Sequence, residues 1–318
     1  MRTNLIYVLA SLITVFASSS SHAKIHSVEH VIIIGCDGMS PDGIRNASAP
    51  VIKSMMLNGS WTLKARAVMP TDSSPNWASM ITGVGPEQHG IVSNNWNTNR
   101  LRIEPTLRGA NGMFPTVFGR LREFRPSAVI GCFYEWDEFN RLLEYEALDV
   151  LKECKNPADT ASRAIEFIRS RKPAFTFIHF DNVDHAGHRY GHGSSAYYRA
   201  VDVVDRQIGQ ILEALENSGM MERTIILVTS DHGGVGRGHG SSSKAEIEIP
   251  WVIYGRDVKA GFEIKAPVNT YDTALTIEYI LGMPSNEATI GKAIKEAFDY
   301  DPQLASERIK WADIKSHN

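Results

Sequence analysis

The sequence predicts an α/β fold, a three-layer α/β/α sandwich with a mostly parallel central sheet. Apolar runs of strand length recur along the chain, and they are continuously apolar rather than alternating. They cover residues 30–37, 127–136, 174–181, 224–231 and 249–255. Strands that are apolar on both faces belong in a parallel sheet that helices cover on either side. Helical patterns lie between these runs, and alternating strands and helices are typical of this fold class.

Helices are indicated most clearly in two segments. Residues 160–172 follow Asp159, which can cap a helix N-terminus. Residues 194–219 place apolar side chains at three- and four-residue spacing and stop at Gly219. Residues 94–114 show little periodicity and several Asn, Arg and Gly residues, which predicts loops or a small insertion. No repeat or linker divides the chain, so we expect residues 24–318 to form a single domain.

The first 23 residues are typical of a secretory signal peptide. Arg2 precedes an apolar run from Leu5 to Phe16, and small residues follow up to Ala23. The run is shorter than the roughly 20 residues that a bilayer requires. We therefore expect cleavage after Ala23, an exported chain that is periplasmic or secreted, and no membrane span in the mature chain.

The composition is that of an ordinary globular protein, with 318 residues, 43% hydrophobic and 22% charged. The net charge of -3 and the mixed signs along the chain provide no basic stripe, so polymeric nucleic acid is not an expected partner. Three cysteines are too few for a disulfide framework. Cys36 and Cys132 lie in apolar runs, and we expect Cys36, Cys132 and Cys154 to be buried thiols.

Carboxylates stand where several predicted strands end. Asp37 closes the first apolar run, Asp181 or Asp184 follows the third, and Asp231 closes the fourth. The carboxyl ends of parallel strands line one edge of a sheet, where ligands bind. Acids far apart in the sequence are thereby expected at one rim.

Histidines accompany these acids at spacings that suit a metal ion. Asp184 and His188 are four residues apart, so one helical turn could aim both at one ion. Asp231 and His232 follow a strand directly, and His239 comes after a glycine-rich turn. Each piece alone is compatible with ordinary surface polar residues. Together they exceed one tetrahedral zinc site, and they favour two catalytic ions of the kind that promote phosphoryl displacement.

The segment "MPTDSSPNWASMITG" (69–83) places Ser73 where a helix begins. Free backbone N–H groups at a helix start favour a serine cap and also a bound phosphate. Ser73 is therefore either a plain cap or, beside metal ions that lower its pKa, a nucleophile.

The order of motifs "GCDGM", "PTDSSPNWASMITGVGPEQHGI", "DHAGH", "SDHGG" and "GHG" resembles the alkaline phosphatase superfamily, and within it the type I nucleotide pyrophosphatase/phosphodiesterase family. The resemblance runs from about His30 to about Pro284, and "NTYDTALTIEYILGMPS" is similar to the closing helix of the superfamily domain. It implies an alkaline-phosphatase-like catalytic domain and a hydrolase that cleaves phosphodiester or nucleotide pyrophosphate bonds.

The resemblance also implies roles for individual residues. It implies one Zn²⁺ held by Asp184, His188 and His239, and a second held by Asp37, Asp231, His232 and the nucleophile. The nucleophile of the family is usually threonine, and Ser73 occupies that position here. A phosphoseryl intermediate and a small phosphate diester or nucleotide as substrate follow. Asn76 matches a family asparagine that supports a phosphate oxygen.

The chain departs from the family pattern in its aromatic residues and in its length. The extra domains and long insertion of larger members do not fit into this chain. Many relatives have histidine where Trp77 stands. A base or phenyl leaving group could stack on one of four aromatic residues, or these could be core residues: Trp77, Trp96, Tyr134 and Trp136. Four further histidines are expected to be structural or to support metal ligands: His89, His179, His185 and His192.

Alternatives remain within and outside the superfamily. A sulfatase would share Ser73 and Pro75, but it would have arginine at the position of Trp77. A phosphomonoesterase would use the same metals and nucleophile, with an added cation for the third phosphate oxygen that no motif supplies. A catalytically inactive zinc-dependent binding protein belongs to a different class, and the complete set of expected ligands disfavours it.

Overall fold

The computed structural model describes residues 28–99, 101–284 and 286–299, so the predicted signal peptide lies outside the described residues. The strands form one sheet. They are β1 (His30–Cys36), β2 (Ser60–Arg66), β3 (Ile130–Tyr134), β4 (Val150–Glu153), β5 (Phe175–Phe180), β6 (Thr224–Thr229), β7 (Glu248–Gly255) and β8 (Phe262–Glu263). The apolar runs of the sequence become β1, β3, β5, β6 and β7, as predicted. The prediction missed β2, β4 and β8, because β4 and β8 are short and partly exposed and β2 lacks a continuous apolar run.

The strand order is β4-β3-β5-β1-β6-β7-β2-β8. β7 pairs antiparallel with both β6 and β2, and the other pairs in the sheet are parallel. β1 lies between β5 and β6, in register over most of its length. The carboxyl ends of β5, β1 and β6 are therefore adjacent at one edge of the sheet.

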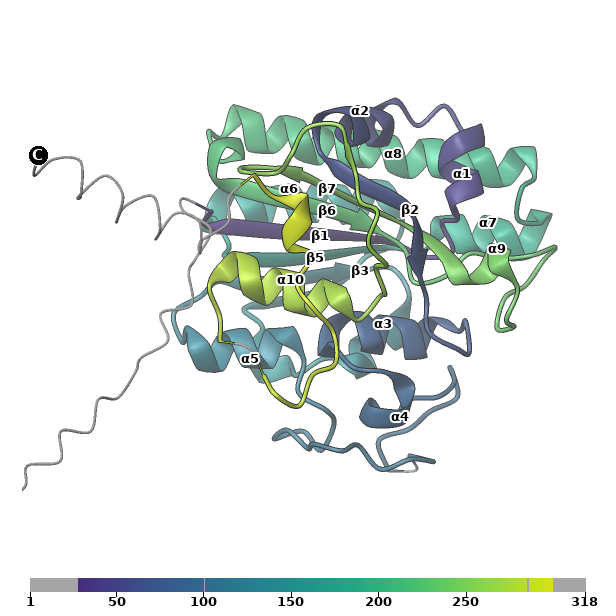
Figure 1. Cartoon of the computed structure of the whole chain (residues 1–318). Helices are drawn as coiled ribbons and strands as arrows, with labels where there is room; N and C mark the ends of the chain where they lie inside the picture. The colour runs from purple at the N-terminus through teal and green to yellow at the C-terminus, as the bar shows by residue number, and fades with distance from the viewer. Residues whose placement is uncertain (1–27, 100, 285, 300–318) are drawn as a thin grey trace, which may run out of the picture.

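Helices cover both faces of this sheet (Figure 1). One face carries α1 (Pro41–Asn46), α2 (Pro50–Asn58), α6 (Pro157–Arg171), α7 (Asn182–Tyr190) and α8 (Ser195–Asn217). The other carries α3 (Ser73–Thr82), α5 (Val117–Phe124) and α10 (Asp272–Leu281). The shorter pieces are α4 (Pro86–His89), α9 (Lys244–Ile247), and the 3₁₀ turns η1 (Asp137–Leu142), η2 (Tyr145–Ala147), η3 (Met221–Arg223) and η4 (Lys295–Ala297).

Two apolar clusters hold these layers together. Along β1, Val31 and Ile33 pack into the cluster beneath α3, α5 and α10, whereas Ile32 and Ile34 pack into the cluster beneath α2, α6 and α8. Alternate strand residues thus serve opposite faces, which explains why the run is apolar without interruption. The predicted three-layer α/β/α sandwich with a mostly parallel sheet is confirmed.

The ends of α6 and α8 agree with those predicted from the sequence, except at the N-cap of α6. α8 begins after Ser194, whose side chain accepts from the Tyr197 N–H, and its last residue is Asn217. α6 begins earlier than predicted, because Asn156 rather than Asp159 is its N-cap and accepts from the Asp159 N–H. The three cysteines are buried, as predicted. None of the described helices is both long and apolar enough to cross a bilayer.

Candidate metal centre

The acids that the sequence places at strand ends lie close together. Asp37 follows β1, Asp231 follows β6, and Asp184 lies in the first turn of α7, which follows β5. The order β5-β1-β6 makes the three strand ends neighbours. Ligand atoms of Asp37, Asp184 and His232 all lie within 4.8 Å of one another, as do those of Asp184, His188 and His239.

The first group consists of Asp184, His188 and His239. His188 Nε2 lies 3.1 Å from Asp184 Oδ2 and 3.1 Å from His239 Nε2. The Nδ1 atoms face backbone carbonyls, at 2.9 Å from Arg237 O for His188 and 2.8 Å from Thr71 O for His239. A carbonyl only accepts, so each Nδ1 donates and each Nε2 is directed into the group, the arrangement usual for metal-binding histidines.

The second group consists of Asp37, Asp231, His232 and Ser73. His232 Nε2 lies 3.4 Å from Asp37 Oδ1, 3.2 Å from Asp231 Oδ2 and 3.2 Å from Ser73 Oγ. Its Nδ1 faces Gly233 O at 2.8 Å. The His232 and His239 rings stack with centroids 3.8 Å apart, so the two groups adjoin each other.

Electrostatics indicate that these groups are built for cations. Asp37 Oδ1, Asp184 Oδ1 and Asp231 Oδ2 are buried and accept no hydrogen bond from the described residues. Burial, reinforced by the neighbouring carboxylates, raises the pKa of Asp37 and of Asp231 well above the usual range. A metal ion would supply the positive charge that these oxygens lack. Hard carboxylates combined with imidazole nitrogens suit zinc or a similar divalent ion.

The protonation of the two neighbouring histidines supports the same interpretation. Burial lowers the pKa of His232 to about 3, with His239 adding to the effect, so its Nε2 presents a lone pair to two carboxylates. The hydrogen bond with Asp184 raises the pKa of His188 to about 9. In the absence of an ion, a proton on His188 thus takes the place that a cation would fill.

Trp77 and His179 both contact one carboxylate oxygen of Asp37. Trp77 Nε1 donates to Asp37 Oδ2 at 3.1 Å, and His179 Nε2 lies 3.3 Å from the same oxygen. The prediction that a substrate could stack on Trp77 is wrong, because the side chain is completely buried. Its ring packs over Gly35, where a Cβ would lie 2.6 Å from Trp77 Cη2. Trp77 is therefore a core residue that holds a carboxylate in place.

The interpretation of Asn76 also requires correction. Asn76 is completely buried, its Oδ1 accepts from the Val68 N–H, and its Nδ2 donates to backbone carbonyls including that of Asp72. These bonds fasten the loop before α3, so the side chain cannot support a phosphate oxygen. Asn94, which the sequence analysis assigned to an irregular loop, lies at the start of α3 instead. Its Oδ1 accepts from the Ser74 N–H at 2.8 Å, which places the amide at the start of α3 beside Ser73.

Ser73 is the first residue of α3, and Asp72 is the N-cap. The plain-cap interpretation of Ser73 is therefore wrong. The other three aromatic residues differ in their surroundings. Tyr134 and Trp96 are both 5% exposed and pack in the apolar cluster beneath α3. Trp96 lines a cavity of about 330 Å³ with the Arg141 guanidinium over its ring. A substrate contact by Tyr134, by Trp96 or by the half-buried Trp136 stays a prediction.

The accessory histidines have distinct surroundings. His89 is buried between Ser79 Oγ and the Ile91 N–H, and burial lowers its pKa to about 3, as expected of a structural histidine. His185 is exposed on α7. His192 lies near Asp184, with 3.8 Å between Nε2 and Oδ1.

Glu135 directly follows β3, and its burial leads to a prediction about how stability depends on pH. Its carboxylate accepts from the Thr160 hydroxyl and from the Asp181 N–H, and burial raises its pKa to about 7. When a carboxyl group has a higher pKa in the folded protein than in the unfolded chain, the folded protein loses stability as the pH rises from the unfolded pKa to the folded pKa. Between about pH 4.5 and pH 7 this group should cost roughly 2–3 kcal/mol of unfolding free energy. Urea titrations of metal-free protein at several pH values should show a flatter profile for Glu135→Gln. An unfolding free energy that depends on pH equally in the parent and in Glu135→Gln would contradict this prediction.

Comparisons with known proteins place the chain in a family. Residues 31–237 match the family of type I phosphodiesterase / nucleotide pyrophosphatase. Venom phosphodiesterase 2 of Crotalus adamanteus is 23% identical over 214 residues, which are 64% of this chain and 26% of the relative. Ectonucleotide pyrophosphatase/phosphodiesterase family member 3 of Rattus norvegicus is 24% identical over 214 residues, with 64% of this chain and 24% of the relative covered. The aligned part thus spans about a quarter of the length of these curated relatives.

Solved structures show the same fold. An inactive murine ectonucleotide pyrophosphatase / phosphodiesterase 5 in complex with AMP superposes with a TM-score of 0.71 at 15% identity, covering 85% of this chain and 100% of that chain. A 2-O GAG sulfatase superposes with a TM-score of 0.68 at 15% identity, covering 85% and 74%. The fold is thus shared across hydrolases of phosphate and sulfate esters. Because the family match covers most of the chain, this protein belongs to the type I phosphodiesterase/nucleotide pyrophosphatase family.

Proposed function

We propose that this protein is a two-zinc hydrolase that cleaves phosphodiester or nucleotide pyrophosphate bonds through a phosphoseryl intermediate. The observation that carries the proposal is the position of Ser73. Its hydroxyl lies 3.2 Å from His232 Nε2, among buried carboxylates, at the first residue of a helix. A hydroxyl so placed adjoins both a candidate metal group and backbone N–H groups that bind phosphate.

The residues divide into ligands and substrate-binding groups. Asp184, His188 and His239 would hold one ion, and Asp37, Asp231 and His232 the other. When bound, the ions supply Lewis-acid chemistry that lowers the pKa of the Ser73 hydroxyl and balances charge on the phosphate. The N–H groups at the start of α3 and the Asn94 amide would bind phosphate oxygens as negative charge develops on them.

The reaction then proceeds in two displacements. The Ser73 oxygen forms a bond to phosphorus in line with the leaving oxygen, and the bond from phosphorus to that oxygen breaks. The first alcohol or phosphate product departs with a proton. A water oxygen next attacks the phosphoserine, the bond between Ser73 Oγ and phosphorus breaks, and the proton from water restores the hydroxyl.

A diester or pyrophosphate is favoured over a monoester because no motif of the sequence supplies an added cation for a third charged phosphate oxygen. Within the described ranges, no lysine or arginine side chain forms an ion pair or hydrogen bond with Asp37, Asp184 or Asp231. A monoester dianion presents one more charged oxygen than a diester and needs an added cation. The complex of a murine relative with AMP supports nucleotides as one substrate class.

Hydrolysis of three synthetic esters by the zinc-loaded protein tests the substrate class. We expect bis-p-nitrophenyl phosphate to have a higher kcat/KM than p-nitrophenyl phosphate, and no turnover of p-nitrophenyl sulfate. A higher kcat/KM for the monoester would make the protein a phosphomonoesterase with the same site. Turnover of the sulfate ester alone would make it a sulfatase.

We further propose that the chain is exported and that residues 24–318 act as one catalytic domain. The apolar run after Arg2 and the small residues up to Ala23 support the export signal. The mass of the exported protein tests this, because cleavage should remove residues 1–23. An exported protein that retains these residues would contradict a cleaved signal.

A further inference from the structure

His192 occupies a narrow site between two glycines. It lies between α7 and α8, and its backbone N–H donates to Gly236 O at 2.7 Å. A Cβ built at Gly187 would lie 2.4 Å from the His192 ring, and one built at Gly234 would lie 2.2 Å from it. Only glycine at these two positions therefore leaves room for the imidazole.

The imidazole is buried without satisfied polar atoms. Its side chain is 3% exposed, and neither ring nitrogen has a hydrogen-bond partner among the described residues. An unpaired buried donor or acceptor costs about 1–3 kcal/mol. A histidine in such a position calls for an explanation in terms of a ligand or a partner.

Asp184 is the partner that the geometry offers. His192 Nε2 is 3.8 Å from Asp184 Oδ1, and this oxygen is itself buried without a hydrogen-bond partner. A shift of about 1 Å would bring the two atoms to hydrogen-bond distance and satisfy both. Asp184 belongs to both groups of candidate ligands, so its orientation affects both.

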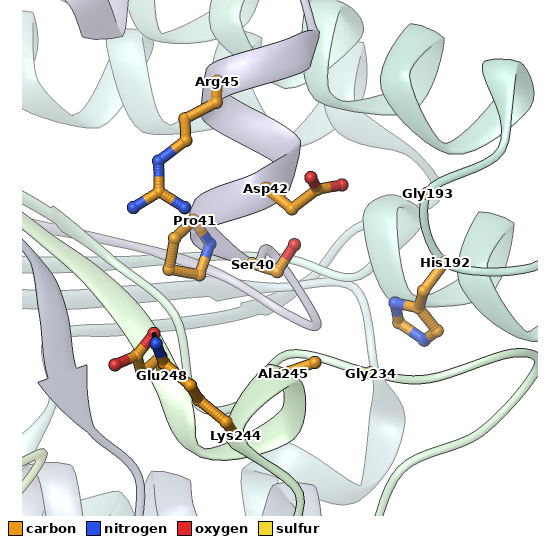
Figure 2. A pocket seen from close by; sticks show the side chains of 10 residues that line it. All are labelled: Ser40, Pro41, Asp42, Arg45, His192, Gly193, Gly234, Lys244, Ala245 and Glu248. Atoms are coloured by element: carbon orange, nitrogen blue, oxygen red, sulfur yellow. Dashed lines mark ion pairs between the residues drawn. The ribbon is translucent and has the colours of Figure 1, made fainter.

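The opposite side of His192 faces away from the metal centre. Figure 2 shows the ring at one end of a pocket of about 340 Å³, with Ser40, Arg45 and Lys244 along the other walls. The pocket lies on the α1 side of the loop that contains Gly234. His192 thus lines this pocket and also lies 3.8 Å from Asp184 Oδ1.

We propose that His192 is a positioning residue whose Nε2–H donates to Asp184 Oδ1 and fixes the carboxylate toward the ions. The inference rests on the proposed function, since it concerns the same metal centre. Hydrogen bonds to ligating carboxylates restrict their rotation, and losing such a partner typically weakens metal binding 10–100-fold, to order of magnitude. The chain would use a buried histidine, admitted by two glycines, to raise its affinity for metal.

Zinc binding by matched variants tests the proposal. His192→Leu removes the donor, and His192→Gln keeps an amide N–H close to the position of Nε2. The exposed His185, one residue after Asp184, provides the control variants His185→Leu and His185→Gln. Competition with a chelator measures the zinc dissociation constant, and thermal unfolding of the metal-free proteins checks that each variant folds.

We expect His192→Leu to weaken the binding of zinc by about 10–100-fold and His192→Gln to restore most of the affinity. Metal-free His192→Leu should unfold at a temperature no lower than that of the parent, because an unsatisfied polar ring is removed. Unchanged zinc affinity in His192→Leu would overturn the proposal. Zinc affinity weakened equally in His192→Leu and His192→Gln would also overturn it, because the shape of the ring rather than its N–H donor would then be what matters.

A measurement on the unsubstituted protein is independent of how the variants fold. In zinc-loaded protein, ¹⁵N resonances should show the His192 proton on Nε2, and a proton on Nδ1 alone would overturn the proposal. A protein that hydrolyses no ester, yet loses zinc affinity in His192→Leu, would support this inference while rejecting the proposed function.

Discussion

Replacing Ser73 by alanine is expected to lower kcat/KM for diester hydrolysis by about 10³-fold or more while zinc stays bound. The substitution removes the oxygen that attacks phosphorus in the first displacement, so no phosphoseryl intermediate can form. The aspartate and histidine ligands remain, so metal content measured by plasma mass spectrometry should equal that of the parent.

Ser74→Ala is a matched control for this result. Ser74 is the next residue of α3, and its hydroxyl is buried without a hydrogen-bond partner in the described structure. Removing it changes the same helix turn without touching the proposed chemistry, so activity should stay close to that of the parent. Full activity in Ser73→Ala would reject the nucleophile. A parent protein that binds zinc but turns over none of the esters would favour the non-catalytic alternative.

Arg120→Met is expected to lower the free energy of unfolding by about 3–5 kcal/mol at neutral pH. Arg120 in α5 donates to Glu278 in α10, with 2.5 Å between Nε and Oε1, and the side chains are 8% and 2% exposed. The substitution leaves the Glu278 carboxylate buried without its cation. Burial already raises the pKa of Glu278, so the loss should shrink at low pH, where the carboxyl is protonated.

The double variant Arg120→Met/Glu278→Leu separates charge from packing. It removes both charges and should recover most of the lost stability, because a buried pair replaced by apolar side chains is often nearly neutral. Urea unfolding of the parent, single and double variants measures the difference. Equal destabilisation of the single and double variants would show that packing between α5 and α10, rather than an unpaired charge, sets the loss.

The fold could be predicted because its strongest signals are local. β1, β5 and β6 are mostly apolar and buried along their whole length, and a carboxylate follows each of them within a few residues. Parallel pairing then brings Asp37, Asp184 and Asp231 to one edge without any knowledge of loop structure. β4 and β8 were missed because a short edge strand has little apolar surface to bury.

The residues around the site were harder to predict, because their roles depend on contacts between distant segments. Asn76 lies in the motif with Ser73, yet the backbone of its own loop uses its whole side chain. Asn94 lies 21 residues after Ser73, and only the tertiary fold brings it to the start of α3. Trp77 is buried because Gly35 in β1 leaves space for its ring, a complementarity that neither residue reveals alone.

The most direct test of the central claim is a zinc titration of chelator-treated protein, with bis-p-nitrophenyl phosphate hydrolysis and bound metal measured on the same samples. We predict that the metal-free protein is inactive and that activity returns as two zinc ions bind per chain. Hydrolysis by the metal-free protein at the rate of the zinc-loaded protein would contradict the claim that the Asp184 and Asp37 groups hold ions that the reaction requires.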